Sequence, residues 1–326
     1  MEEQVIINKK DIKRGANRVA LGLILYTIIM YATVLFHYII SNILAYIIFW
    51  EDEALQEQAL QKLENILLES GGSSILAVIM GCIILFVCFY KDISVKTLFQ
   101  RTSEKKMTSL TFLQLLCIFM LCQLVFTFAS MFLELGLNVF GYSAMASLEA
   151  ATSVSETVSM FLYASFVGPI AEEIVYRGFV LRCLEKYGKL VALIVSSVLF
   201  GFMHANLPQG IFAFGVGLIL GYVALEYSIG WSIALHIFNN FVFSDLLGKA
   251  VAGLNETMQV ILMYGVELAL AIPAVVILWK KRGVMKQFCQ ENKPKKKMYR
   301  YIFLSIGMII FIAVNLGLAI WSLEKI

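Results

Sequence analysis

The residues most suited to chemistry gather in the stretch Pro169–Leu181, which contains Glu172, Glu173 and Arg177. The stretch lies inside a run that is otherwise apolar enough to cross a bilayer. One charged side chain at the centre of a membrane helix costs roughly 2.5–3.5 kcal/mol, so three together cost on the order of 8–10 kcal/mol before they pair. Such a cluster predicts either an ion pair that joins two helices or a site of chemistry.

Helical geometry separates the two glutamates. On an α-helix, Glu173 and Arg177 lie only about 40° apart, whereas Glu172 is about 140° away from the arginine. Glu173 is therefore the predicted ion-pair partner of Arg177. Glu172 has no neutralising neighbour on its own helix, and a buried carboxylate of this kind is suited to act as a general base.

The chain has three histidines, and two of them follow the acidic cluster in similar settings. His204 ends the sequence Phe200-Gly-Phe-Met-His, and His236 begins His-Ile-Phe-Asn-Asn240, so each has a companion four residues away on one helical face. At a rise of about 1.5 Å per residue, Glu172 and both histidines lie roughly 10–21 Å from the predicted cytoplasmic boundary. They can meet in the inner half of the membrane if their helices touch.

Composition identifies the class of protein. The 326 residues are 60% hydrophobic, with a mean hydropathy of +0.81, well above the roughly 45–50% apolar content of soluble domains. The six cysteines form no CxxC pattern, and we expect neither disulfides nor a cysteine-bound metal. The sequence predicts an all-α, multi-pass membrane bundle with no nucleic-acid site.

Charge and hydropathy together predict about nine membrane helices. Basic segments lie inside and acidic segments outside when the N-terminus is cytoplasmic and the C-terminus is external. The predicted spans are Val19–Trp50, Ile75–Tyr90, Leu110–Leu137, Val158–Val180, Leu190–Ala205, Ile211–Glu226, Trp231–Leu247, Met258–Trp279 and Tyr301–Leu323.

These spans divide into three predicted parts, residues 1–154, 155–250 and 251–326, with the chemistry in the middle part. In the first part, Glu51–Ser74 predicts an outer amphipathic helix closed by a glycine C-cap, followed later by a cytoplasmic loop. In the third, Lys280–Arg300 predicts a basic cytoplasmic loop near anionic lipid.

Three further features of the predicted spans bear on packing. His37 predicts a hydrogen-bonded packing residue. Glu267, in the middle of the eighth span, predicts a hydrogen-bonded packing carboxyl with no identified partner, in preference to a catalytic one. Gly217 and Gly221 predict close approach of a neighbouring helix, more readily within one chain than between two.

The order EExxxR, FxxxH and HxxxN on successive membrane helices resembles the CAAX protease and bacteriocin-processing family of intramembrane endopeptidases, which includes the type II CAAX prenyl endopeptidases. The resemblance covers Ser155 to about Leu247. It implies that Glu172, assisted by His204, activates a water, and that His236 and Asn240 stabilise the oxyanion. It also implies that Glu173, Arg177 and Phe200 support the site.

These roles agree with what amide hydrolysis needs: a base for water, a donor for the oxyanion and an acid for the leaving amine. Zinc remains an alternative, with Glu172, His204 and His236 as candidate ligands. However, the histidines lie on separate helices without an HExxH motif, and Glu172 would have to serve as ligand and base together. We favour a metal-free site.

The resemblance implies a membrane-bound or prenylated peptide or protein as substrate, and the size and lack of organelle signals favour a bacterial cell membrane. Two other functions fit the same residues. One is a non-catalytic bacteriocin-immunity or partner-binding protein of the same family. The other is a transporter that relays protons through its buried acids and histidines, but the sequence lacks the inverted repeat that many transporters show.

Overall fold

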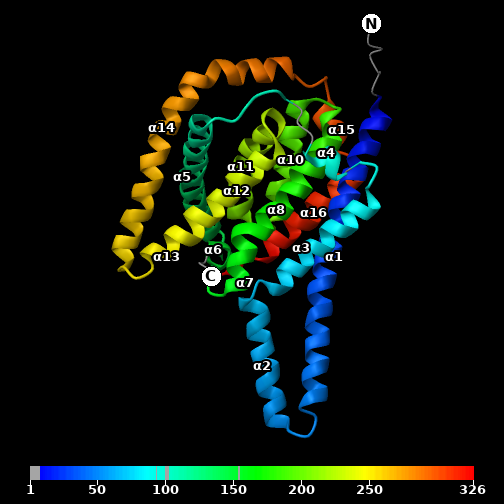
Figure 1. Ribbon diagram of the computed structural model, residues 1–326, viewed down its shortest axis with the longest axis vertical. Helices are drawn as coiled ribbons and strands as arrows, with labels where there is room; N and C mark the ends of the chain where they lie inside the picture. Colours follow the sequence, from blue (N-terminus) through cyan, green and yellow to red (C-terminus); the bar gives the residue numbers. More distant parts are fainter. Residues whose placement is uncertain (1–7, 93, 100–102, 153–154) are drawn as a thin grey trace.

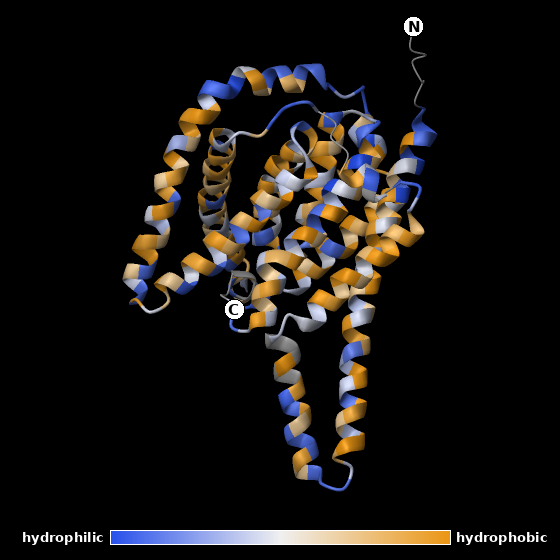
Figure 2. Ribbon diagram, viewed as in Figure 1, coloured by the Kyte–Doolittle hydropathy of each residue, from blue (hydrophilic) through white to orange (hydrophobic). Residues whose placement is uncertain are grey.

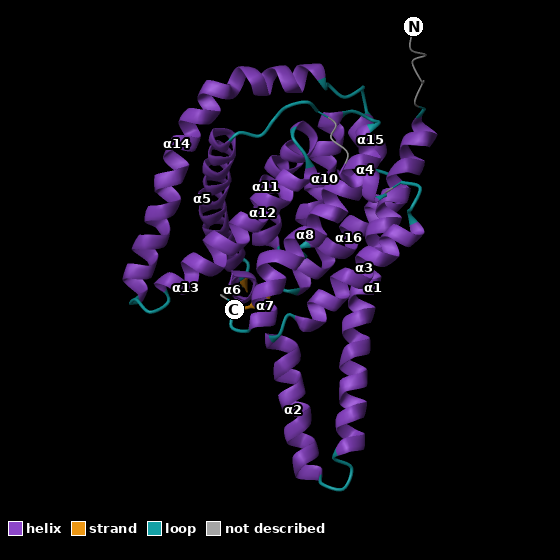
Figure 3. Ribbon diagram, viewed as in Figure 1, coloured by secondary structure: helices purple, strands orange, loops and turns teal. Residues whose placement is uncertain are grey.

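The computed structural model, which describes residues 8–92, 94–99, 103–152 and 155–326, is almost entirely helical. Figure 1 shows the chain as a bundle of helices, and Figure 3 shows how little of it is strand. The elements are α1 (Lys9–Ile48), α2 (Glu53–Glu69), α3 (Gly72–Cys88), α4 (Val95–Phe99), α5 (Ser109–Val139), β1 (Tyr142–Ser143), α6 (Met145–Thr152), α7 (Val158–Leu162), η1 (Tyr163–Val167), α8 (Gly168–Glu173), η2 (Ile174–Val180), α9 (Leu181–Glu185), α10 (Lys189–Met203), α11 (Leu207–Glu226), α12 (Ile229–Phe238), η3 (Asn239–Leu246), α13 (Leu247–Val251), α14 (Glu256–Glu291), α15 (Met298–Phe303), α16 (Ile306–Trp321) and β2 (Glu324–Lys325).

The helices confirm an all-α membrane bundle. Within the described residues, five helical runs are long and apolar enough to cross a bilayer, and three shorter helices are apolar: Lys9–Ile48, Ser109–Val139, Val158–Glu185, Leu207–Glu226 and Glu256–Glu291, then Gly72–Cys88, Lys189–Met203 and Ile306–Trp321. The predicted seventh span falls in the continuous run α12–η3–α13. The count of nine, the orientation and the three-part division stay predictions.

The helices of the predicted middle part lie at the centre of the bundle. Figure 1 shows α8, α10, α11 and α12 between two flanking pairs, α1 with α3 on one side and α5 with α14 on the other. The buried core is continuous through these central helices and includes Val175, Phe179, Leu199 and Leu220. The acidic cluster therefore lies on one of the most enclosed helices of the protein.

Small residues bring α10 and α11 into close contact. A Cβ atom at Gly221 would come within 2.6 Å of the Leu193 side chain, and one at Gly217 within 3.1 Å of Ser197. Gly201 and Gly210 lie against each other's backbone in the same way. This confirms that the GxxxG glycines pack against a helix of the same chain, and it fixes α10, which carries His204, tightly against α11.

The first helix is longer than the bundle. Figure 1 shows the second half of α1 leaving the bundle beside α2 as a helical hairpin, and the residues of α1 that are buried lie between Ile12 and Tyr26, apart from Ala45. The predicted helix after Glu51 is present as α2, but its glycine C-cap was wrong. Ser70, with an extended backbone, is the C-cap of α2. Gly71 is the N-cap of α3, and its φ of −75° is a value that does not require glycine.

Two expectations for the C-terminal part were also wrong. Most of the basic segment predicted as a loop is helical, since α14 continues through Pro273 to Glu291 and ends shortly before Pro294. Figure 2 shows this hydrophilic end of α14 lying across one end of the bundle, where Phe288 packs on Tyr222 with ring centroids 5.5 Å apart. The predicted last span is divided into α15 and α16 at Leu304 and Ser305.

Candidate active site

The acidic cluster lies on one continuous helical run, Val158–Glu185, in which α-helical and π-helical segments alternate. Two π-helical segments, η1 and η2, enclose the short α-helix α8, and Asn240 lies in a third, η3. π-helical turns are rare and occur frequently at functional sites. All three segments in this chain carry or flank the residues of the sequence motifs.

Glu173 is fully buried and has two hydrogen-bond partners and one ion-pair partner. Its Oε1 lies 3.1 Å from the Arg177 guanidinium and 3.0 Å from Nδ1 of His236. The Ser232 hydroxyl donates to Oε2 at 2.5 Å. The expected pairing with Arg177 is present, and two partners from α12 join it. The carboxylate thus ties the acidic helix to the helix that carries His236.

Arg177 is enclosed by this carboxylate and an aromatic ring. Its guanidinium carbon lies 4.3 Å from the centre of the Phe200 ring, and none of its side-chain atoms is exposed. The same ring meets His204 and His236 edge-on, with centroids 5.0 and 6.1 Å away. Phe200 therefore contacts the cation and both histidines. The FxxxH spacing places it one helical turn before His204.

Hydrogen bonds define the same tautomer for both histidines. Nδ1 of His204 lies 2.8 Å from the Phe200 carbonyl oxygen, and Nδ1 of His236 lies 3.0 Å from the Glu173 carboxylate. A carbonyl or an ionised carboxylate only accepts, so Nδ1 must be the donor in each ring. In the neutral form Nε2 then carries the lone pair, and both histidines are able to take up a proton there.

Glu172 faces the second of these histidines. Its Oε2 lies 3.7 Å from Nε2 of His236, and about a quarter of the Glu172 side chain (24%) is exposed, compared with none of Glu173. Glu172 also interacts electrostatically with His204. The structure therefore brings together Glu172, His204 and His236, which the sequence placed on three separate helices.

Asn240 is fixed by neighbouring groups at the start of η3. Its side-chain nitrogen donates to the Ala164 carbonyl oxygen at 3.0 Å, and its oxygen accepts from Asn239 at 3.1 Å. An amide nitrogen carries two hydrogens, so one remains for another acceptor. The hydrogen bond to Ala164 connects η3 with η1, next to the acidic helix.

The chain turns sharply directly after His204. Ala205 has a φ of +47°, a left-handed conformation that glycine adopts easily and alanine rarely. Such a conformation costs of order 1–3 kcal/mol and persists where the surroundings require it. Asn206 then caps α11 by accepting from the backbone of Gln209, so His204 is held at a short, defined corner between α10 and α11.

A metal-free site stays a prediction. Among the residues that the structure describes, no three histidine, cysteine, aspartate or glutamate side chains are grouped so that they could hold one. Nδ1 of each histidine donates a hydrogen bond, which leaves Nε2 as the atom of each ring that carries a lone pair. We therefore derive no step through a metal.

Sequence reasoning missed Ser232 and Asp245. Ser232 lies one helical turn before His236, so its position at i−4 was the available signal. Asp245 lies in the predicted seventh span, where a carboxylate should have drawn attention. His37 is hydrogen-bonded as expected, to the Ser73 hydroxyl at 2.6 Å, and takes no part in the site.

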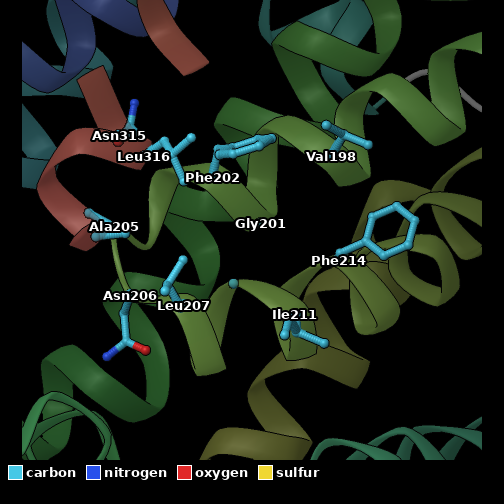
Figure 4. Close-up of a pocket in the computed structure, with 12 residues that line it drawn as sticks. Val198, Gly201, Phe202, Ala205, Asn206, Leu207, Ile211, Phe214, Asn315 and Leu316 are labelled. Carbon is cyan, nitrogen blue, oxygen red and sulfur yellow. The ribbon is translucent and has the colours of Figure 1, made fainter. Parts of the chain in front are cut away.

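An apolar cavity beside α10 is separate from the site. A cavity of about 340 Å³ lies between α10, α11 and α16, and Figure 4 shows Val198, Phe202, Ile211, Phe214 and Leu316 around it. Its lining includes none of the motif residues of the site. The cavity begins beside Ala205, on a face of α10 that the site does not use.

Comparison with known proteins agrees with the motifs. Residues 154–242 match the family model described as type II CAAX prenyl endopeptidase Rce1-like. The match confirms the family resemblance that the three motifs predicted. It covers α7 to η3, the segment with all the motif residues, whereas the helices before and after it lie outside the match. No curated protein and no solved structure matches the chain.

Proposed function

We propose that this protein is an intramembrane endopeptidase that hydrolyses a peptide bond in a membrane-associated or lipidated peptide or protein. The observation that carries the proposal is the Glu172 carboxylate 3.7 Å from Nε2 of His236, with that histidine oriented by Glu173. The match to the Rce1-like family supports a CAAX-type membrane protease in general.

In the proposed reaction, Glu172 acts as the general base. A separation of 3.7 Å is too long for a direct hydrogen bond but suits a water bonded to both groups. Glu172 takes a proton from this water as its oxygen attacks the peptide carbonyl carbon. His204, whose Nε2 carries a lone pair in the neutral ring, assists Glu172 in activating this water.

The tetrahedral intermediate then carries a negative charge on the former carbonyl oxygen. The proposed donors to this oxyanion are the second hydrogen of the Asn240 amide and Nε2–H of His236, whose ring takes up a proton from solvent before the attack and keeps it throughout the reaction. The intermediate collapses by breaking the C–N bond, and the proton held by Glu172 passes to the leaving amine. No metal takes part, and Glu173, Arg177 and Phe200 keep the groups in position.

The proposal is tested by comparing purified wild type with Glu172→Gln, both exhaustively treated with chelator. A library of membrane-anchored and prenylated peptides is the substrate, and products are identified by mass spectrometry. We expect wild type to cleave after chelation and the variant to lose at least 10²–10⁴-fold of the rate, the usual contribution of a general base. Glu267→Gln is the matched control, because it also neutralises a carboxyl in a membrane helix.

Two results would contradict parts of the proposal. Cleavage that stops on chelation and returns with added zinc would replace the metal-free mechanism by a metal-dependent one. Folded wild type that cleaves nothing in the library, with or without zinc, would favour the non-catalytic immunity or partner-binding function.

A further inference from the structure

Asp245 is a buried carboxylate that the proposed reaction does not use. Its residue is only 3% exposed, and both of its oxygens accept hydrogen bonds. The Ser165 hydroxyl donates to Oδ2 at 2.5 Å, and the backbone N–H of Ser155 donates to Oδ1 at 3.2 Å. These bonds reach segments 80 and 90 residues earlier in the chain.

Asp245 and Asn240 both bond to the same short segment of the chain. Asn240 holds the Ala164 carbonyl and Asp245 holds the neighbouring Ser165 hydroxyl. The π-helical segment η3 is thereby attached to the π-helical segment η1 at two consecutive residues. A single attachment would let one segment rotate about it, whereas two set both the distance and the register between them.

This register determines where Glu172 lies. The segment η1 continues without interruption into α8, which ends with Glu172 and Glu173. On the other side, η3 continues directly from α12, which carries His236 near its end. Moving η1 against η3 would therefore change the separation between the Glu172 carboxylate and Nε2 of His236, now 3.7 Å.

We propose that Asp245 is a positioning residue, which sets the separation of Glu172 and His236 through Ser165 and Ser155. The inference rests on the proposed function for its catalytic consequence but not for its geometry. A carboxylate accepts from both groups, whereas an asparagine that accepts from the Ser155 N–H would turn its NH2 toward Ser165. The short charge-assisted bond from the Ser165 hydroxyl would then be replaced by a longer and weaker neutral bond in the opposite direction.

The main variant is Asp245→Asn, with Ser165→Ala as a milder variant that removes one bond and leaves the carboxylate. Glu134→Gln is the matched control. Glu134 also accepts from a serine hydroxyl, Ser143 at 2.6 Å, and from a backbone N–H, Ala144 at 2.9 Å. Glu134→Gln therefore measures the general cost of disturbing such a pair of hydrogen bonds at a place away from the site.

Two readouts are used. The first is the kinetics of peptide cleavage, and the second is the ¹⁵N spectrum of histidine-labelled protein in detergent. The chain contains three histidines, so signals are assigned by single substitutions, and His37, bonded to Ser73, serves as an internal reference.

For both Asp245→Asn and Ser165→Ala we expect kcat to fall, by on the order of 10-fold or more for Asp245→Asn, with KM nearly unchanged, since small misplacements of reacting groups cost up to about 10²-fold. The His236 signals should move, while His37 stays in place and Glu134→Gln behaves like wild type in both readouts.

The proposal is overturned if both variants keep the wild-type kcat and His236 signals, or if Glu134→Gln loses as much activity as Asp245→Asn. If Asp245→Asn does not fold, Ser165→Ala alone decides by the same criteria. If wild type cleaves no peptide, the proposed function fails, and the His236 signals still decide whether Asp245 positions that residue.

Discussion

Two carboxyl groups in membrane helices, Glu173 and Glu267, have opposite surroundings. Glu173 contacts a guanidinium, an imidazole and a hydroxyl on three sides. Oε2 of Glu267 is buried without a hydrogen-bond partner among the residues that the structure describes. The helices differ too. In the most apolar 18 residues of the run Val158–Glu185, 33% are buried, compared with 11% in α14.

This difference shows that the role of an acidic residue in a membrane helix is indicated by the groups that contact it. An unpaired carboxyl can lose its charge at modest cost, whereas a carboxylate with two hydrogen bonds and an ion pair depends on all three partners. Glu173 belongs to a built polar network, and neighbouring Glu172 benefits from it. The sequence predicts a hydrogen-bonded packing carboxyl at Glu267, but its Oε2 has no hydrogen-bond partner among the described residues, and its role stays a prediction.

The largest expected effect comes from removing the cation. Arg177→Ala would leave Glu173 buried without its opposite charge, and we expect a loss of about 3–5 kcal/mol in the free energy of unfolding. The measurement is the midpoint of thermal unfolding in detergent together with the folded yield. A purified Arg177→Ala protein as stable as wild type would show that the ion pair does not support the site.

A smaller effect is expected from Ser232→Ala. Glu173 would lose one of its three partners in a dry environment, which costs about 1–3 kcal/mol. The same unfolding assay applies, with Ser228→Ala as the control, because Ser228 only caps α12 at an exposed position. Equal losses in both variants would argue against a special role for the bond to Glu173.

Glu267→Gln should change stability by no more than about 1 kcal/mol, because no partner of the buried oxygen is lost. Cleavage activity should remain at the wild-type level. A strong loss of either would show that Glu267 has a partner outside this chain or a role in the reaction, and the contrast with Glu173 would disappear.

The smallest effect concerns a third carboxylate, Glu226, at the end of α11. Lys105 and Lys189 both pair with it, and the hydrogen bond to Glu226 raises the pKa of Lys105 above its usual range. Since the folded pKa is raised, the stabilisation is complete at neutral pH and is lost only as the pH rises through that pKa in strongly alkaline solution.

Lys105 is half exposed, so Lys105→Met should cost at most about 0.5 kcal/mol at neutral pH. Unfolding midpoints of wild type and variant, measured from pH 7 into the alkaline range, test this. The two curves should converge at high pH, and a difference that grows with pH would contradict the assignment.

Much of the fold follows from the sequence because apolar runs of membrane length must form helices. The ends of helices that depend on contacts with neighbouring helices were harder to predict. The continuation of α14 beyond Trp279 and the break at Ser305 are not marked by hydropathy, since charged residues continue a helix as readily as they end one.

The candidate site was predictable as far as helical spacing reaches. The pairing of Glu173 with Arg177 follows from their separation by four residues. The third contact of Glu173, from Ser232, and the bonds of Asp245 depend on which helices pack together and in what register. One sequence contains no direct measure of that.

The π-helical segments have a consequence for insertions and deletions. A π-helical turn contains one residue more than an α-helical turn, so deleting one residue from η3 would allow a regular α-helix there. Because the wider turn absorbs that residue, the helix after the deletion would keep about its present direction and faces. Asn240 and Asp245, five residues apart, both bond to η1 from the π-helical turn. After a deletion between them they would be four residues apart and would share a face of the α-helix. A one-residue deletion at this place should therefore be tolerated far better than a one-residue insertion.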